Sequence, residues 1–193
     1  MELISNLFHQ IPKRVKISFI TAFVLGLLVH LYMLTNGFLN HDSMFNFYAD
    51  RAGAGSGRYT LQYLNGITSN FDLHYLNALV SIIYISLTVV LLVELFKITS
   101  KSLIVLFSLL YVSYPTISAT FAYMFTSDGY FLAKFLTVLA IYLVFNLKHK
   151  WISFPIGAVL IYIALGTYQI NIALALTLIL FLFIRDNLVE KSI

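Results

Sequence analysis

Long apolar runs alternate with short polar segments along the 193 residues of this chain. The first run, 17–38, has 22 residues, and a helix of about 20 residues crosses the roughly 30 Å of membrane hydrocarbon. Further runs cover 76–96, a stretch from 102 to about 126 that contains Pro115, and 130–147. Because proline removes a helix hydrogen bond, we expect a kink at Pro115. With the last run described below, the pattern predicts an all-α, polytopic transmembrane helical bundle of about six membrane helices.

The last apolar run, 152–184, has 33 residues without a charge. As one helix it would be about 50 Å long, which is too long for a bilayer. The polar sequence Gly166-Thr167-Tyr168-Gln169 is predicted to split it into a broken helical hairpin whose arms have about 14 or 15 residues each. The tip of such a hairpin would lie below the membrane surface, where irregular backbone is tolerated if it lines a cavity. We therefore expect Tyr168 and Gln169 to face a pocket.

Two polar segments complete the single membrane domain predicted for residues 1–193. Residues 1–16 are predicted to form a cytoplasmic interfacial helix followed by a basic anchor. Residues 39–72 form external loop 1, in which 43–49 and 59–64 are predicted to be short interfacial helices. Within the first membrane helix, His30 is expected to hydrogen-bond to a neighbouring helix.

Composition and charge support this topology. Apolar residues make up 60% of the chain and charged residues 10%, against about 25% charged in soluble domains. Nine of the 12 Lys and Arg residues fall on one predicted side of the membrane and two on the other, which places the N-terminus in the cytoplasm. The basic residues flank apolar runs, so they do not indicate nucleic-acid binding. The chain has no cysteine, which excludes disulfide and thiolate chemistry.

The predicted topology collects acidic side chains on the external face. Asp42 follows the first membrane helix, and it either acts as a general base or caps a short helix. His41 beside it either shares in proton transfer and substrate binding or is structural. Asp128 opens the helix at 130–147, where it either is stabilised by the helix dipole or acts as a second catalytic acid that orients substrate or helps to hold a divalent cation.

Two cations belong to the same candidate site. Arg58 closes a glycine-containing segment of external loop 1, and guanidinium groups match phosphate oxygens; the alternative is a solvated loop arginine. Lys134 lies within a membrane helix, where a lysine costs about 2.5–3.5 kcal/mol. It either binds a lipid phosphate or extends to the surface. Together with Tyr168 and Gln169, these residues form the predicted substrate-binding set.

Four short motifs carry a family resemblance: Asn40-His41-Asp42-Ser43, Gly57-Arg58, Ser127-Asp128-Gly129-Tyr130 and Gly166-Thr167-Tyr168-Gln169. In their order and sidedness they resemble the GtrII-type glucosyltransferase family, which is similar to the wider GT-C class of polytopic enzymes. The resemblance covers about 17–184. It implies that Asp42 matches the acid of the first external loop, that Asp128 matches the second acidic position, and that Arg58 and Gln169 match further family positions.

The resemblance also implies an activity. Such enzymes move a hexose, typically glucose, from a polyprenyl-phosphate-linked sugar to a surface polysaccharide such as O-antigen or to a lipid-linked acceptor. They act at the periplasmic face of the bacterial inner membrane and contact membrane lipids. Family members are usually about twice this length or more, so the resemblance leaves three possibilities for this chain: a truncated gene product, a fragment or a minimal version. The alternatives are a non-catalytic protein that binds or translocates lipid-linked sugars, and an inactive truncated remnant.

Overall fold

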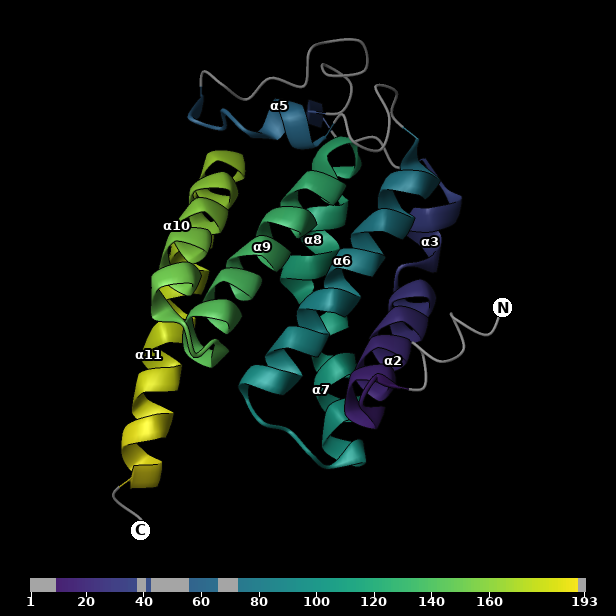
Figure 1. Cartoon of the computed structure of the whole chain (residues 1–193). Helices are drawn as coiled ribbons and strands as arrows, with labels where there is room; N and C mark the ends of the chain where they lie inside the picture. The colour runs from purple at the N-terminus through teal and green to yellow at the C-terminus, as the bar shows by residue number, and fades with distance from the viewer. Residues whose placement is uncertain (1–9, 38–40, 43–55, 66–72, 191–193) are drawn as a thin grey trace.

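A computed structural model describes residues 10–37, 41–42, 56–65 and 73–190 of the chain, and all regular elements in these ranges are helices (Figure 1). This result confirms the predicted all-α class. The elements, in order, are α2 (Lys13–Val29), α3 (Leu31–Thr35), α5 (Leu61–Leu64), α6 (His74–Leu95), α7 (Lys101–Val112), α8 (Pro115–Phe121), the 3-10 helix η2 (Met124–Thr126), α9 (Ser127–Asn146), α10 (Lys150–Thr167) and α11 (Asn171–Glu190).

Four segments in the described part of the chain are long and apolar enough to cross a membrane. They are α6, the segment Met124–Asn146, α10 and most of α11. The bent pair of α7 and α8 would make a fifth span if its two helices cross as one. The fold is therefore that of a polytopic membrane protein, and the more specific number of about six membrane helices stays a prediction.

The first predicted membrane helix is interrupted at His30. The α2 helix has 17 residues, and a turn at His30 separates it from α3. The buried His30 ring hydrogen-bonds through Nε2 to the Val112 carbonyl oxygen at 3.1 Å and packs on the Phe121 ring at 4.4 Å. The expected interhelical bond is confirmed, and it joins the top of α2 to the end of α7.

The predicted kink at Pro115 is also confirmed. The α7 and α8 helices meet at an angle of 46°, and Pro115 occupies the first position of α8. Proline is well tolerated at that position because its missing N–H would have no partner within the helix. The bend redirects α8 relative to α7, so that Tyr111 and residues of α8 line one wall of the cavity described below.

The final hairpin exists, but its arms are longer than predicted. The α10 helix has 18 residues and α11 has 20, in place of 14 or 15. The prediction stopped at the charged residues, whereas Lys150 begins α10 and Arg185 continues α11. Charged side chains are good helix formers, so they ended the apolar run without ending the helix. Arms of this length can cross a membrane completely.

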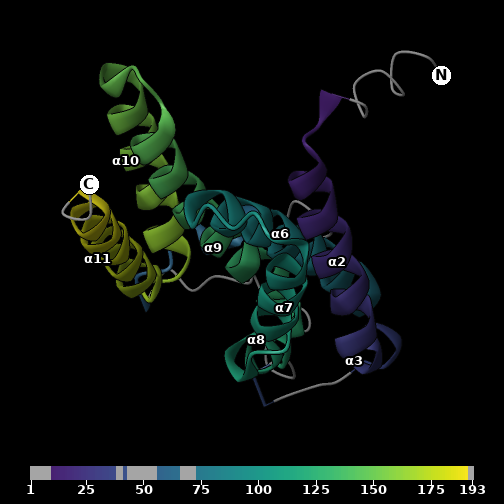
Figure 2. The ribbon, with the colours of Figure 1, turned by 90° about the horizontal axis from the view of Figure 1, so that it is seen from below.

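The α9 helix occupies the middle of the bundle. It packs against α6 on one side and α10 on the other, and α6 in turn packs against α2 (Figures 1 and 2). One buried apolar cluster joins α2, α6, α7, α8 and α9, and a second joins α6, α9 and α11. Gly26 of α2 lets the two helices approach closely, since an added Cβ would lie 2.8 Å from the Ile82 side chain of α6.

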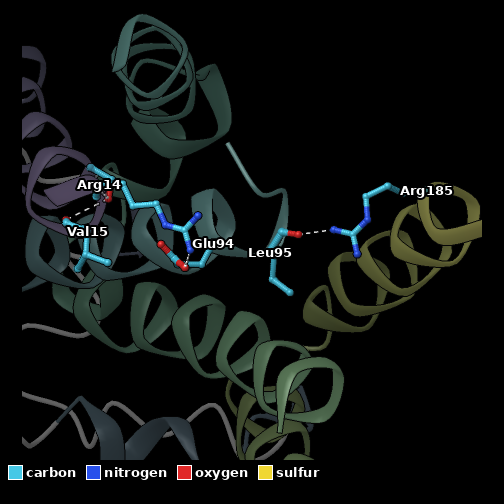
Figure 3. Close-up of polar contacts among 6 residues, drawn as sticks. Arg14, Val15, Glu94, Leu95 and Arg185 are labelled. Carbon is cyan, nitrogen blue, oxygen red and sulfur yellow. Dashed lines mark hydrogen bonds and ion pairs between the residues drawn. The ribbon is translucent and has the colours of Figure 1, made fainter. Parts of the chain in front are cut away.

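Polar contacts fasten the end of the bundle that lies opposite α5. Arg14 of α2 forms an ion pair with Glu94 of α6, and Arg185 of α11 donates to the Leu95 carbonyl oxygen at the end of α6 (Figure 3). A carbonyl at a helix C-terminus has no partner within the helix and favours a cation. These contacts tie α2 and α11 to α6 from two sides.

External loop 1 is described in part. Its second predicted helix, 59–64, is present as the shorter α5. The first predicted helix, 43–49, and nearly all of the predicted N-terminal helix lie outside the described residues. In Figure 1, α5 lies at the top of the bundle, at the same end as the connection between α10 and α11.

Candidate active site

Residues 56–61 of the loop are fastened to the top of the α10–α11 hairpin. The Thr60 amide donates to the Gly166 carbonyl oxygen at 2.9 Å, and the hydroxyls of Thr60 and Thr167 lie 2.8 Å apart. Gln169 donates through Nε2 to the Ser56 carbonyl oxygen at 3.0 Å. Segments more than 100 positions apart in the sequence are thereby held as one unit.

Two glycines make this close approach feasible. Gly57 has a φ of +76°, a left-handed conformation that other residues adopt only at a cost. At Gly166 an added Cβ would lie 2.5 Å from the Tyr59 ring, so a larger residue there would displace the loop. The motifs Gly57-Arg58 and Gly166-Thr167 therefore meet in space.

The side chain of Asn171 hydrogen-bonds to backbone carbonyl groups at the break between α10 and α11. Its Nδ2 donates to the carbonyl oxygens of Tyr168, at 2.9 Å, and Ala164, at 3.3 Å. Asn171 is buried, with 2% of its surface exposed. The amide group supplies hydrogen-bond donors to carbonyls near the interruption and thereby fixes the position of Tyr168.

Arg58 lies against two tyrosines that the fold brings together. Its Nη1 donates to the Tyr130 hydroxyl at 2.8 Å, and its guanidinium carbon lies 5.0 Å from the centre of the Tyr168 ring. The rings of Tyr130 and Tyr168 stack with their centres 4.7 Å apart. A cation over an aromatic face is stabilised by the ring quadrupole. No carboxylate in the described part of the chain pairs with Arg58.

Lys134 lies one helical turn beyond Tyr130 on α9. Its Nζ donates to the Thr120 hydroxyl of α8 at 3.2 Å and lies 4.7 Å from the centre of the Phe131 ring. Within the described ranges, Lys134 has no carboxylate partner either. The amine is therefore held against α8 of the bundle, next to the cavity described below.

One cavity of about 790 Å³ connects these groups. Its volume falls in the range of about 300–1,000 Å³ that is typical of small-molecule sites. Four of the predicted site residues line it: Asp42, Arg58, Lys134 and Tyr168. Hydroxyl-bearing side chains form much of the remaining polar wall: Tyr111, Tyr114, Thr116, Thr120, Tyr123 and Thr177. Apolar residues of α11 and of the turn before it, including Leu174 and Ile170, complete the lining.

Asp42 reaches the rim of this cavity. Its side chain is 55% exposed, and its Oδ1 lies 3.4 Å from Nδ1 of His41. His41 itself is not among the lining residues. A half-exposed carboxylate with an imidazole beside it can receive a proton from a hydroxyl group in the cavity and pass it to solvent.

Two more predicted site residues, besides His41, do not line the cavity. Asp128 is buried, with 2% of its surface exposed, and it does not line the cavity, although Tyr130 two positions later does. Gln169 is exposed and contacts the loop through Ser56, so its contact with substrate stays a prediction that the present geometry does not favour. The described residues contain no group of three or more His, Asp or Glu side chains that could hold a metal ion.

Sequence reasoning missed three residues. Tyr130 was given no role in the candidate site, yet it bonds Arg58; its spacing of four residues from Lys134 placed both on one face of α9. Thr120 and Asn171 gave no functional signal, because a threonine or an asparagine in an apolar run does not show which group it bonds: Asn171 bonds Tyr168 and Ala164, and Thr120 accepts from Lys134 on the facing helix. Helical spacing could have found Tyr130, whereas the other two required the tertiary structure.

The fold and cavity define a polytopic α-helical membrane protein with an internal polar site. The chain belongs to the family described as glucosyl transferase GtrII, whose sequence model matches residues 31–192. Comparison with curated proteins and with solved structures gave no match. Family membership confirms the resemblance described above and implies a glucosyltransferase that uses a sugar donor and an acceptor.

Proposed function

We propose that this protein transfers a hexose, glucose in view of its family, from a polyprenyl-phosphate-linked donor to a surface polysaccharide such as O-antigen, or to a lipid-linked acceptor. The proposed location is the bacterial inner membrane, with the N-terminus in the cytoplasm and the cavity open to the periplasm. The basic residues that flank the apolar runs support this orientation.

One observation carries the proposal: Arg58 and Lys134 line the same cavity, and neither pairs with a carboxylate in the described part of the chain. Cations inside a membrane protein are costly unless they serve a ligand or find an anion. A phosphate group bound between them would supply that anion. The apolar lining from α11 is compatible with a phosphate that carries a hydrocarbon tail.

The proposed reaction assigns a role to each group. The acceptor hydroxyl attacks the anomeric carbon of the donor, and the bond from that carbon to the phosphate oxygen breaks. Asp42 removes the proton of the hydroxyl, while Arg58 and Lys134 stabilise the charge on the departing phosphate. Tyr168 and the hydroxyl-bearing wall contact the sugar. Asp128, behind the cavity wall, orients these elements, and His41 assists proton transfer.

Substitution of Asp42 tests the proposal. The purified Asp42→Asn variant is assayed for glucose transfer from a polyprenyl-phosphate glucose and, separately, for binding of polyprenyl phosphate. We expect transfer to fall at least about 100-fold, as general-base catalysis contributes about 10²–10⁴, while lipid binding persists. Asp186→Asn, an acid of α11 that pairs with Arg185 outside the cavity, is the matched control.

The outcomes separate the alternatives. Transfer at the wild-type rate by Asp42→Asn would contradict the assignment of Asp42 as the base. Lipid binding without transfer by the wild-type protein would favour a binding or translocation protein. Absence of both, in a protein that remains folded, would favour an inactive remnant.

A further inference from the structure

The amine of Lys134 is held in place by a hydroxyl on the facing helix. Its Nζ donates to Thr120 Oγ1 at 3.2 Å, and Thr120 Oγ1 in turn donates to the Thr116 carbonyl oxygen at 2.8 Å. The second bond directs the hydroxyl hydrogen toward the helix backbone, so that a lone pair faces the amine. Thr120 thus acts as an acceptor of fixed orientation.

An ammonium group has three donors, and one of them is used by Thr120. In the described part of the chain no carboxylate and no carbonyl bonds Nζ, whose other contact is the face of the Phe131 ring at 4.7 Å. Lys134 and Thr120 both line the cavity. The remaining donors are therefore available to a ligand inside it.

The number of cations can be compared with the charge of the proposed ligand. A donor phosphodiester carries one negative charge. When the glucosyl group leaves, the bonding electron pair stays on the phosphate oxygen, and the acceptor proton goes to Asp42. The product is a lipid phosphomonoester, whose charge near pH 7 is about −1.5 to −2. One cation matches the donor, and two cations match the product.

We propose that Lys134, positioned by Thr120, binds the negative charge that the lipid phosphate gains during transfer, so that the cavity prefers the phosphomonoester to the phosphodiester. Thr120 is a positioning residue that acts through Lys134. The flexible stem of lysine allows the amine to leave the cavity unless an acceptor holds it. This inference rests on the proposed function, because that function supplies the ligand.

The experiment measures a ratio of affinities. The full chain in lipid nanodiscs is titrated with polyprenyl phosphate and with its methyl phosphodiester, which has the same tail and one charge. We expect the wild-type protein to bind the monoester about tenfold more tightly, since one additional hydrogen bond to a charged group contributes about 1.5–3 kcal/mol and tenfold in affinity corresponds to about 1.4 kcal/mol. Thr120→Val keeps the side-chain shape without the hydroxyl, and Lys134→Met removes the charge. Both variants should bind the monoester and the diester about equally.

Two further variants exclude a merely structural role. Thr120→Ser retains the hydroxyl and should keep the wild-type preference for the monoester. Thr137→Val removes a buried hydroxyl that bonds the Ala133 carbonyl within α9, at 2.8 Å, and lies outside the cavity lining; it should leave the ratio unchanged. If Thr137→Val and Thr120→Val lose the preference for the monoester to a similar extent, the proposed role of Thr120 is overturned.

The two affinities also separate a failure of this inference from a failure of the proposed function. Equal binding of both lipids by the wild-type protein would overturn the role of Lys134 while leaving a lipid-phosphate donor acceptable. Binding of neither lipid would contradict the proposed donor itself. A wild-type preference that survives in Lys134→Met would assign the second charge to a different group and overturn the inference.

Discussion

The guanidinium of Arg58 and the hydroxyl of Tyr130 are joined by a hydrogen bond of 2.8 Å, although the two residues lie 72 positions apart. The bond fastens the external loop to the first turns of α9. It also leaves the guanidinium facing a cavity that Asp42 and Lys134 share. The distribution of charge in the site therefore depends on a tyrosine that carries no charge of its own.

Removing the Tyr130 hydroxyl should weaken catalysis without unfolding the protein. Hydrogen bonds to charged groups contribute about 1.5–3 kcal/mol, so Tyr130→Phe should lower kcat/KM for transfer about 10- to 100-fold. Steady-state assays with varied lipid donor measure this change. Tyr63→Phe is the control, because Tyr63 is 72% exposed on α5 and lies outside the cavity lining. Equal effects of the two substitutions would contradict a specific role for the Arg58–Tyr130 bond.

Gly129→Ala should destabilise the fold. A Cβ at this position would lie 2.2 Å from Oδ1 of Asn65, which is completely buried, so the Asn65 side chain or the start of α9 would have to shift within a packed interior. Overpacking of this kind costs about 1–3 kcal/mol, and each kcal/mol lowers Tm by about 2–4 °C in a protein of this size. Thermal unfolding in detergent measures the change. Gly37→Ala, where the nearest atom would be 3.8 Å away, should leave Tm unchanged within about 1 °C.

Gln169→Leu should release the loop without changing the cavity wall directly. The substitution removes the bond from Nε2 to the Ser56 carbonyl oxygen and leaves Gly57 without its neighbour. Loss of one hydrogen bond of about 1 kcal/mol should speed amide hydrogen exchange in residues 56–61 about fivefold. Gln62→Leu, at an exposed position of α5, is the matched control. If exchange is unchanged and Gln169→Leu instead weakens donor binding, Gln169 contacts the substrate, as its place in the predicted substrate-binding set requires.

The ion pair between Arg14 and Glu94 should contribute measurable stability. Their side chains are 39% and 16% exposed, so the pair lies between an exposed pair, worth about 0–1 kcal/mol, and a buried one, whose disruption costs about 3–5 kcal/mol. A double-mutant cycle with Arg14→Gln and Glu94→Gln should give a coupling energy of about 1–2 kcal/mol. The exposed Lys13→Gln should change stability by less than about 0.5 kcal/mol. A coupling energy of zero would show that the two side chains lie close together without stabilising the fold.

Much of the fold follows from the apolar pattern. Helix positions, the bend at Pro115 and the division of the last run were predictable, because burial in lipid requires helices and proline and polar residues interrupt them. The interruption at His30 and the true lengths of α10 and α11 were not. The first depends on a distant carbonyl of Val112, and the second depends on charged residues that a helix accepts readily.

The candidate site was predictable in its members and less so in its geometry. Residue type and sidedness indicated Asp42, Arg58, Lys134 and Tyr168, all of which line the cavity. Sidedness alone could not distinguish these from Asp128 and Gln169, which lie at the same end of the molecule but face other parts of the protein. That distinction depends on helix rotation and on loop contacts, which are set by packing across the bundle.

The amide of Asn171 makes one position unusually intolerant of a small chemical change. Replacing its NH₂ by an oxygen, as in Asn171→Asp, would preserve size and shape but place an acceptor opposite the carbonyls of Ala164 and Tyr168. Repulsion between the new carboxylate and these carbonyl oxygens would disturb the turn that holds Tyr168 against Arg58, so a change of one atom at Asn171 would alter the wall of the cavity.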